Sequence, residues 1–186
     1  MPIEIRLCSL AAARWLERLA SDPAASRPTG IGRMFDRALT RLKAQDGSGP
    51  IPVVGAALAK GGVSFESADF VTSAIHAMGL TAAIGKRSSD EAYELEHFVR
   101  GESPFCENLP STLVSAHAIS CAPRAAAARL GAWARGLDRA IYSAEVADMY
   151  GTEAVDSYLA AAEDLIGVLT SVDTHDADIC CISTGS

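Results

Sequence analysis

The chain has 186 residues, of which 49% are hydrophobic and only 6% are aromatic, and its formal net charge is −7. This length fits one domain that buries roughly 70% of its unfolded surface. The sequence contains no apolar run near the ~18 residues of a membrane-spanning helix and no signal-peptide core, and its acidity argues against nucleic acid. We therefore expect a cytoplasmic protein with neither a membrane nor a nucleic acid as its main partner.

Charge is segregated along the chain. Residues 1–60 carry a net charge of +4, residues 61–186 carry −11, and no Lys or Arg follows Arg139. Opposite charges attract each other and steer association. The pattern therefore favours a defined orientation between the basic part and the acidic part, either within one molecule or between two.

The first half of the chain shows helical spacing interrupted by loops rich in Pro and Gly. Ser9 can cap a first helix, and the segment near residues 23–30, which contains two prolines, is a candidate hinge. The clearest helical period lies between Ile31 and Ala44. Further helices are expected over residues 52–60 and from Ser64 to Gly79.

The second half gives more helix signals. Ser88 and Glu91 have the spacing of a capping box, which predicts a helix that ends at Gly101. A short helix is expected over residues 113–119. One long helix is expected from Pro123 to its end at Gly151, and a last one follows, capped by Thr152.

We find no convincing period-two alternation and no internal repeat. The sequence therefore predicts an all-α fold, a helical bundle of about seven or eight helices with an N-terminal basic helical layer or arm.

For domain organisation, we expect a single helical domain over residues 1–171 and a tail over residues 172–186 that is either flexible or docked. The tail carries Ile179 and Ile182 around the two tail thiols, Cys180 and Cys181. This short apolar cluster can dock in a groove of the bundle or of a neighbour. Its acidic surroundings weaken the case for the thiols as nucleophiles.

Arginines recur at helical spacing in the basic part. Arg33, Arg37 and Arg41 are four residues apart, and Arg14 and Arg18 form a similar pair. A guanidinium group donates two parallel hydrogen bonds to a carboxylate, so these arginines are candidate partner-binding residues. The alternative is a solvated face that touches the acidic helices of its own chain.

A candidate metal site comprises His97, Cys106, His117 and Cys121. His117 and Cys121 have i, i+4 spacing, and imidazole and thiolate are ligands that Zn²⁺ prefers. Zinc is the one cofactor that the sequence suggests. The alternative is that these are small core residues, because no Cys-x-x-Cys pair accompanies them.

These patterns favour a non-catalytic helical scaffold, adaptor or regulatory subunit that binds another protein or a second copy of itself. The phosphate-loop, nucleophile-elbow and zinc-protease motifs are missing from the sequence. The alternative is a small metalloprotein or metal-dependent enzyme that uses the His/Cys cluster at residues 97–121.

Overall fold

The structure is a computed structural model that describes residues 1–11, 14, 61–102 and 118–184. The strands are β1 (Ile3–Cys8), β2 (Gly62–Phe65), β3 (Ala118–Ala122) and β4 (Asp178–Ser183). The helices are α4 (Ala68–Ile84), α5 (Asp90–Arg100), α7 (Arg124–Arg135), α8 (Arg139–Tyr150) and α9 (Val155–His175), with a 3-10 turn, η3 (Thr152–Ala154), between the last two.

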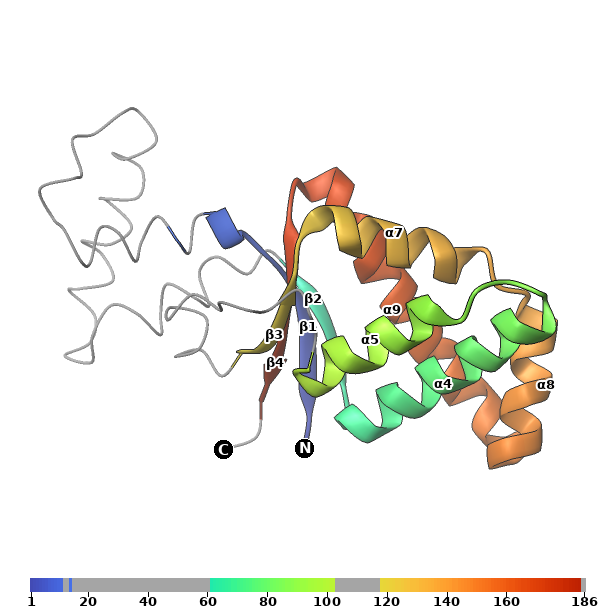
Figure 1. Cartoon of the computed structure of the whole chain (residues 1–186). Helices are drawn as coiled ribbons and strands as arrows, with labels where there is room; N and C mark the ends of the chain where they lie inside the picture. The colour runs from blue at the N-terminus through green and yellow to red at the C-terminus, as the bar shows by residue number, and fades with distance from the viewer. Residues whose placement is uncertain (12–13, 15–60, 103–117, 185–186) are drawn as a thin grey trace, which may run out of the picture.

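The predicted all-α bundle of seven or eight helices is wrong. The described residues form five α-helices and a four-stranded antiparallel sheet in the order β2-β1-β4-β3. The five helices lie together on one side of the sheet (Figure 1). The physical reason is visible in β1, where Ile3, Ile5 and Leu7 are buried and alternate with the half-buried Glu4 and Arg6. This period of two is typical of a strand.

One face of the sheet packs against the helices. Directly paired residues share a face, and Ile5 pairs with Cys181, which pairs with Ser120. This face meets the helices, because Cys181 Sγ donates to the carbonyl of Val99 at 3.8 Å and Ser120 Oγ donates to that of Phe98. The helix-facing residues of β1 and β4 therefore belong to the main hydrophobic core.

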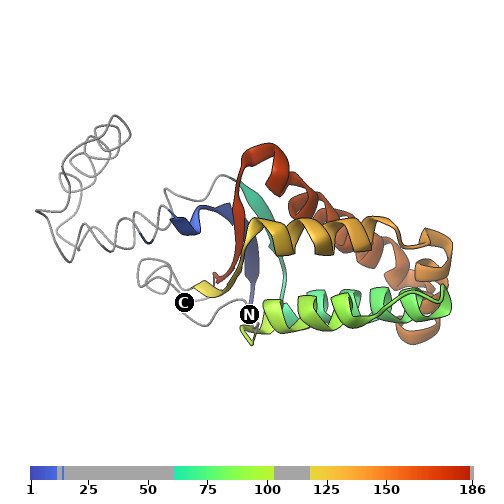
Figure 2. The same cartoon turned by 45° about the horizontal axis from the view of Figure 1, so that its top comes forward.

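The helical layer supplies the rest of that core. Ile75 and Met78 of α4, Leu130 of α7 and Leu169 of α9 are at most 1% exposed. Figure 2 shows α7 and α9 above α4 and α5, so the helical layer contains two packed helix pairs on one side of the sheet. Within the described ranges, no helix is both long enough and apolar enough to cross a membrane.

Several helix ends follow the sequence signals. The helix predicted after Ser88 is α5, and it ends at Gly101, which has a left-handed φ of 81° as a helix C-cap commonly does. Gly79, in contrast, does not end α4. A Cβ there would lie 3.0 Å from the Cβ of Ala92, so this glycine allows α4 and α5 to approach closely.

The single long helix predicted between Pro123 and Gly151 is two helices, α7 and α8. The guanidinium of Arg87 fills the space beside Gly136 and donates to the carbonyl of Trp133 at 3.0 Å, which satisfies the end of α7. Asp138 then accepts hydrogen bonds from the backbone N–H groups of Ala140 and Ile141 and starts α8.

Other predictions fall partly or wholly outside the described residues. Residues 118 and 119 of the short helix predicted over 113–119 belong to β3. The helices predicted over residues 31–44 and 52–60 and the hinge near residues 23–30 lie outside the described ranges. The segment predicted as a tail contains the end of α9 and the whole of β4, which pairs with both β1 and β3.

Two helical glycines give opposite stability predictions. A Cβ at Gly131 of α7 would lie 3.0 Å from Leu169 Cβ and 3.1 Å from its carbonyl carbon, whereas a Cβ at Gly167 of α9 would meet nothing within 4 Å. Gly131→Ala should therefore lower the free energy of unfolding by about 1–3 kcal/mol through overpacking. Gly167→Ala should raise it by roughly 0.5–1 kcal/mol, because alanine favours the helix.

Urea unfolding followed by circular dichroism measures both changes. Equal effects of the two substitutions would contradict the close packing of α7 against α9.

Candidate functional site

The corner where α8 turns into α9 concentrates negative charge. Asp148, Glu153 and Asp156 are all exposed, and within the described part of the chain none of them has a basic ion-pair partner. Arg139, at the start of α8, pairs instead with Glu163 of α9. We call Asp148, Glu153 and Asp156 the acidic corner.

Backbone geometry fixes this corner. Gly151 ends α8 with a φ of 94°, and a Cβ there would lie 2.5 Å from a carboxylate oxygen of Glu153. A residue with a side chain would therefore be strained and would also collide with that carboxylate. Glycine therefore permits the turn that ends α8, with the carboxylate of Glu153 lying next to Gly151.

The charge at the end of α8 is locally unfavourable. A helix C-terminus carries a partial negative charge, which favours a cation, yet the last turn of α8 has no basic residue and contains Asp148. An external cation would relieve this repulsion. The carboxylates of Glu153 and Asp156, at the start of α9, are stabilised by the N-terminal end of that helix.

Aromatic side chains lie beside the acidic corner. Tyr150 is 37% exposed and stacks on Tyr158 with ring centroids 4.7 Å apart, and Tyr158 meets the ring of Phe70 edge-on at 4.9 Å. Tyr142 O–H donates to the carbonyl of Tyr158 at 3.2 Å, and burial raises the pKa of Tyr142, so its hydroxyl stays protonated as a donor. The stack is thus held between α4, α8 and α9.

The structure describes one of the five arginines predicted to bind a partner. Arg14 is helical and exposed, whereas Arg18, Arg33, Arg37 and Arg41 lie outside the described residues. The helical segment that begins at Leu10 leaves the sheet on the side opposite α8 (Figures 1 and 2). The start of this segment therefore points away from α8 and the acidic corner.

The structure describes two of the four candidate zinc ligands, His97 and Cys121, and they do not lie together. His97 Nδ1 lies 3.0 Å from a carboxylate oxygen of Glu102 on the helical side, while Cys121 lies on the opposite face of the sheet. Cys106 and His117 are outside the described residues. The residues that are described contain no group of three or more His, Cys, Asp or Glu arranged to hold a metal ion. The four-ligand site stays a prediction.

Cys121 lies instead beside two other thiols. It pairs directly with Cys180, and Cys180 is hydrogen-bonded to Cys8, whose strand partner is Asp178. The hydrogen bond with Cys180 and then burial raise the pKa of Cys8, so this thiol stays protonated and is a poor nucleophile. Sequence reasoning missed Cys8 because only strand pairing brings it next to Cys180.

The two tail thiols are buried in β4, with Cys180 1% and Cys181 0% exposed. We expect a maleimide to label both of them, and Cys8, roughly a thousandfold or more slowly in native protein than in denatured protein, because reaction requires an opening of several kcal/mol. Peptide mass spectrometry gives the rate at each cysteine. A cysteine introduced at the exposed Ser157 serves as the control and should react quickly. Equal native and denatured rates at Cys180 would mean that β4 does not occupy the sheet.

Comparisons with known proteins return no relationship: no family model, no curated protein sequence and no solved structure matches this chain. Its function has to be inferred from the geometry and charge of its own residues.

Proposed function

We propose that this protein is a non-catalytic scaffold, adaptor or regulatory subunit that acts through protein–protein interaction, and that its acidic corner binds the basic face of a second copy. The observation that carries the proposal is the set of exposed carboxylates at Asp148, Glu153 and Asp156, for which the described part of the chain supplies no basic partner. Charge complementarity of this kind accelerates association and selects the partner.

The chemistry of the corner fits arginine in particular. A guanidinium group donates two hydrogen bonds to a carboxylate and also stacks on an aromatic ring. The corner offers carboxylates beside the exposed ring of Tyr150. Residues 1–60 of the same sequence carry a net charge of +4 and contain the arginines at positions 33, 37 and 41, which are the proposed partner residues.

Association between copies is favoured over contact within one copy. The helical segment that begins at Leu10, at the start of the basic part of the chain, leaves the sheet on the side opposite α8 (Figure 1). A second copy brings the two surfaces together without rearranging the sheet. We place this assembly in the cytoplasm, because the odd number of cysteines in the sequence, five, is typical of a protein with reduced thiols.

The test compares two triple variants with the same change in net charge. Asp148→Asn/Glu153→Gln/Asp156→Asn removes the acidic corner, and Glu66→Gln/Asp69→Asn/Asp90→Asn removes three exposed carboxylates elsewhere. The corner variant should raise the dissociation constant of self-association roughly tenfold, because three exposed ion pairs contribute about 1.5 kcal/mol together. The control should change it by less than about twofold.

Sedimentation velocity at ionic strengths of about 0.01 M and 1 M measures the association. The Debye length falls from about 30 Å to about 3 Å between these two conditions, so a charge-driven association should weaken.

The stability of the corner variant should stay nearly unchanged. Loss of the Asp148 charge removes a repulsion at the C-terminal end of α8, while loss of the Glu153 and Asp156 charges removes an attraction at the N-terminal end of α9, and each effect amounts to tenths of a kcal/mol. Arg33→Gln/Arg37→Gln/Arg41→Gln should reproduce the corner variant. A wild-type monomer at low salt, or equal effects of the two acidic triples, would disprove the proposal.

A further inference from the structure

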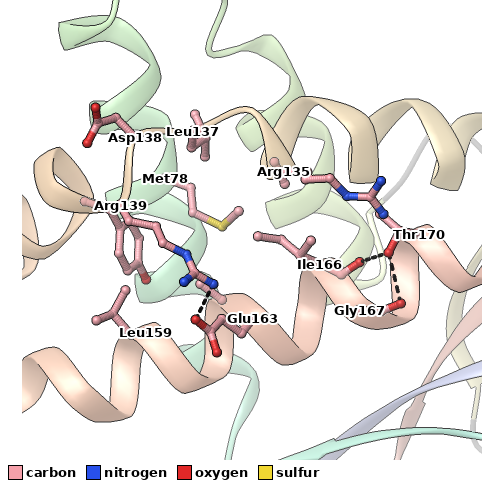
Figure 3. A pocket seen from close by; sticks show the side chains of 13 residues that line it. Met78, Arg135, Leu137, Asp138, Arg139, Leu159, Glu163, Ile166, Gly167 and Thr170 are labelled. Carbon is pink, nitrogen blue, oxygen red and sulfur yellow. Dashed lines mark hydrogen bonds and ion pairs between the residues drawn. The ribbon is translucent and has the colours of Figure 1, made fainter.

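The helical layer contains a pocket that none of the sequence motifs pointed to. It opens where α4, α7, α8 and α9 meet, next to the turn between α7 and α8, and has a volume of about 330 Å³ (Figure 3). This size is at the lower end of the range for small-molecule sites. If each non-hydrogen atom takes up about as much space as a water molecule, ~30 Å³, the pocket holds about ten of them.

The inner surface of the pocket is apolar. Met78 and Tyr142 are 1% and 3% exposed, and Leu159 and Ile166 pack against the core from α9. Gly167 adds only backbone to the wall, and no heavy atom lies within 4 Å of where its Cβ would be. Hydrocarbon placed here would leave water and contact these side chains.

The rim, in contrast, is charged. Arg139 points toward Glu163 and forms an ion pair with it, and the carboxylate of Asp138 is occupied by the backbone N–H groups that begin α8 (Figure 3). Arg135 also lines the pocket, with its guanidinium directed toward Thr170. Among the described residues, no carboxylate forms an ion pair with Arg135.

The backbone around the pocket adds positive charge. The first turn of α8 lies at the rim, and a helix N-terminus carries a partial positive charge. The opposing negative end of α7 is neutralised by Arg87, which donates to the carbonyl of Trp133 at 3.0 Å. The pocket thus combines an apolar interior with an unpaired guanidinium, although residues 61–186 have a net charge of −11.

We propose that this pocket binds a small organic monocarboxylate with an unbranched or compact apolar tail, about ten non-hydrogen atoms in all. The carboxylate accepts two parallel hydrogen bonds from the Arg135 guanidinium, and the tail lies against Met78, Leu159 and Ile166. The Arg139–Glu163 pair closes one side of the mouth. This site is separate from the acidic corner and does not depend on the proposed self-association.

Octanoate is the probe, with 1-octanol as a neutral ligand of similar length. Met78 is one of four methionines, so its labelled methyl group reports on the pocket in an NMR titration, and the methyl group of Met149, outside the pocket, serves as the internal reference. Octanoate should shift the Met78 methyl signal saturably, with a dissociation constant in roughly the millimolar range. It should bind roughly tenfold more tightly than octanol.

Arg135→Gln removes the charge and should reduce the octanoate preference to about twofold or less while leaving octanol binding unchanged. Arg100→Gln is the matched control, because Arg100 is exposed on α5 and does not line the pocket. It should leave both affinities unchanged. Because both arginines are exposed, neither variant is expected to unfold the protein.

Three results would overturn the proposal: no saturable shift of the Met78 methyl group with octanoate, equal affinity for octanoate and octanol in the wild type, or unchanged octanoate affinity in Arg135→Gln. Each is distinguishable from failure of the self-association proposal, because the titration is performed at an ionic strength of about 0.1 M with the Asp148→Asn/Glu153→Gln/Asp156→Asn variant, which lacks the acidic corner but keeps every charged residue of the pocket.

Discussion

The pairing of β4 with β1 is the interaction on which the rest of the described structure depends. It joins residues 3–8 to residues 178–183, and β4 also pairs with β3, so one strand holds both neighbours in register. Its first residue, Asp178, further accepts hydrogen bonds from the backbone N–H groups of Leu10 and Arg124. The helix-facing side chains of the sheet reach the core only when this strand is in place.

The sequence predicted helices better than strands. Apolar residues in α5 recur with a strong helical period, and helix ends carry recognisable signals, such as Gly101 after α5 and Gly151 after α8. The strands are short, between four and six residues, and β4 reads as a continuous apolar run without alternation. Alternation of period two covers only the six residues of β1 and the four of β2 among the described strands, and pairing between distant segments leaves no local pattern.

Of the two proposed binding sites, the sequence indicates the acidic corner but not the pocket. The charge segregation that underlies the acidic corner can be read from the sequence, because it depends on composition. The pocket cannot, since Met78, Arg135 and Ile166 come from three helices whose crossing sets their arrangement. The break between α7 and α8, which forms the rim, depends on Arg87 from another part of the chain. The position of the pocket therefore depends on how the helices pack, which local sequence patterns do not specify.

The place of β4 in the sheet has a consequence for synthesis. A ribosome makes β1 first among the four described strands and β4 last, so the edge of β1 that pairs with β4 stays unpaired while all five described α-helices emerge. Unpaired strand edges promote intermolecular pairing, and contacts between distant segments form slowly. The nascent chain should therefore engage a chaperone during translation, and its sheet should close only after β4 has left the exit tunnel.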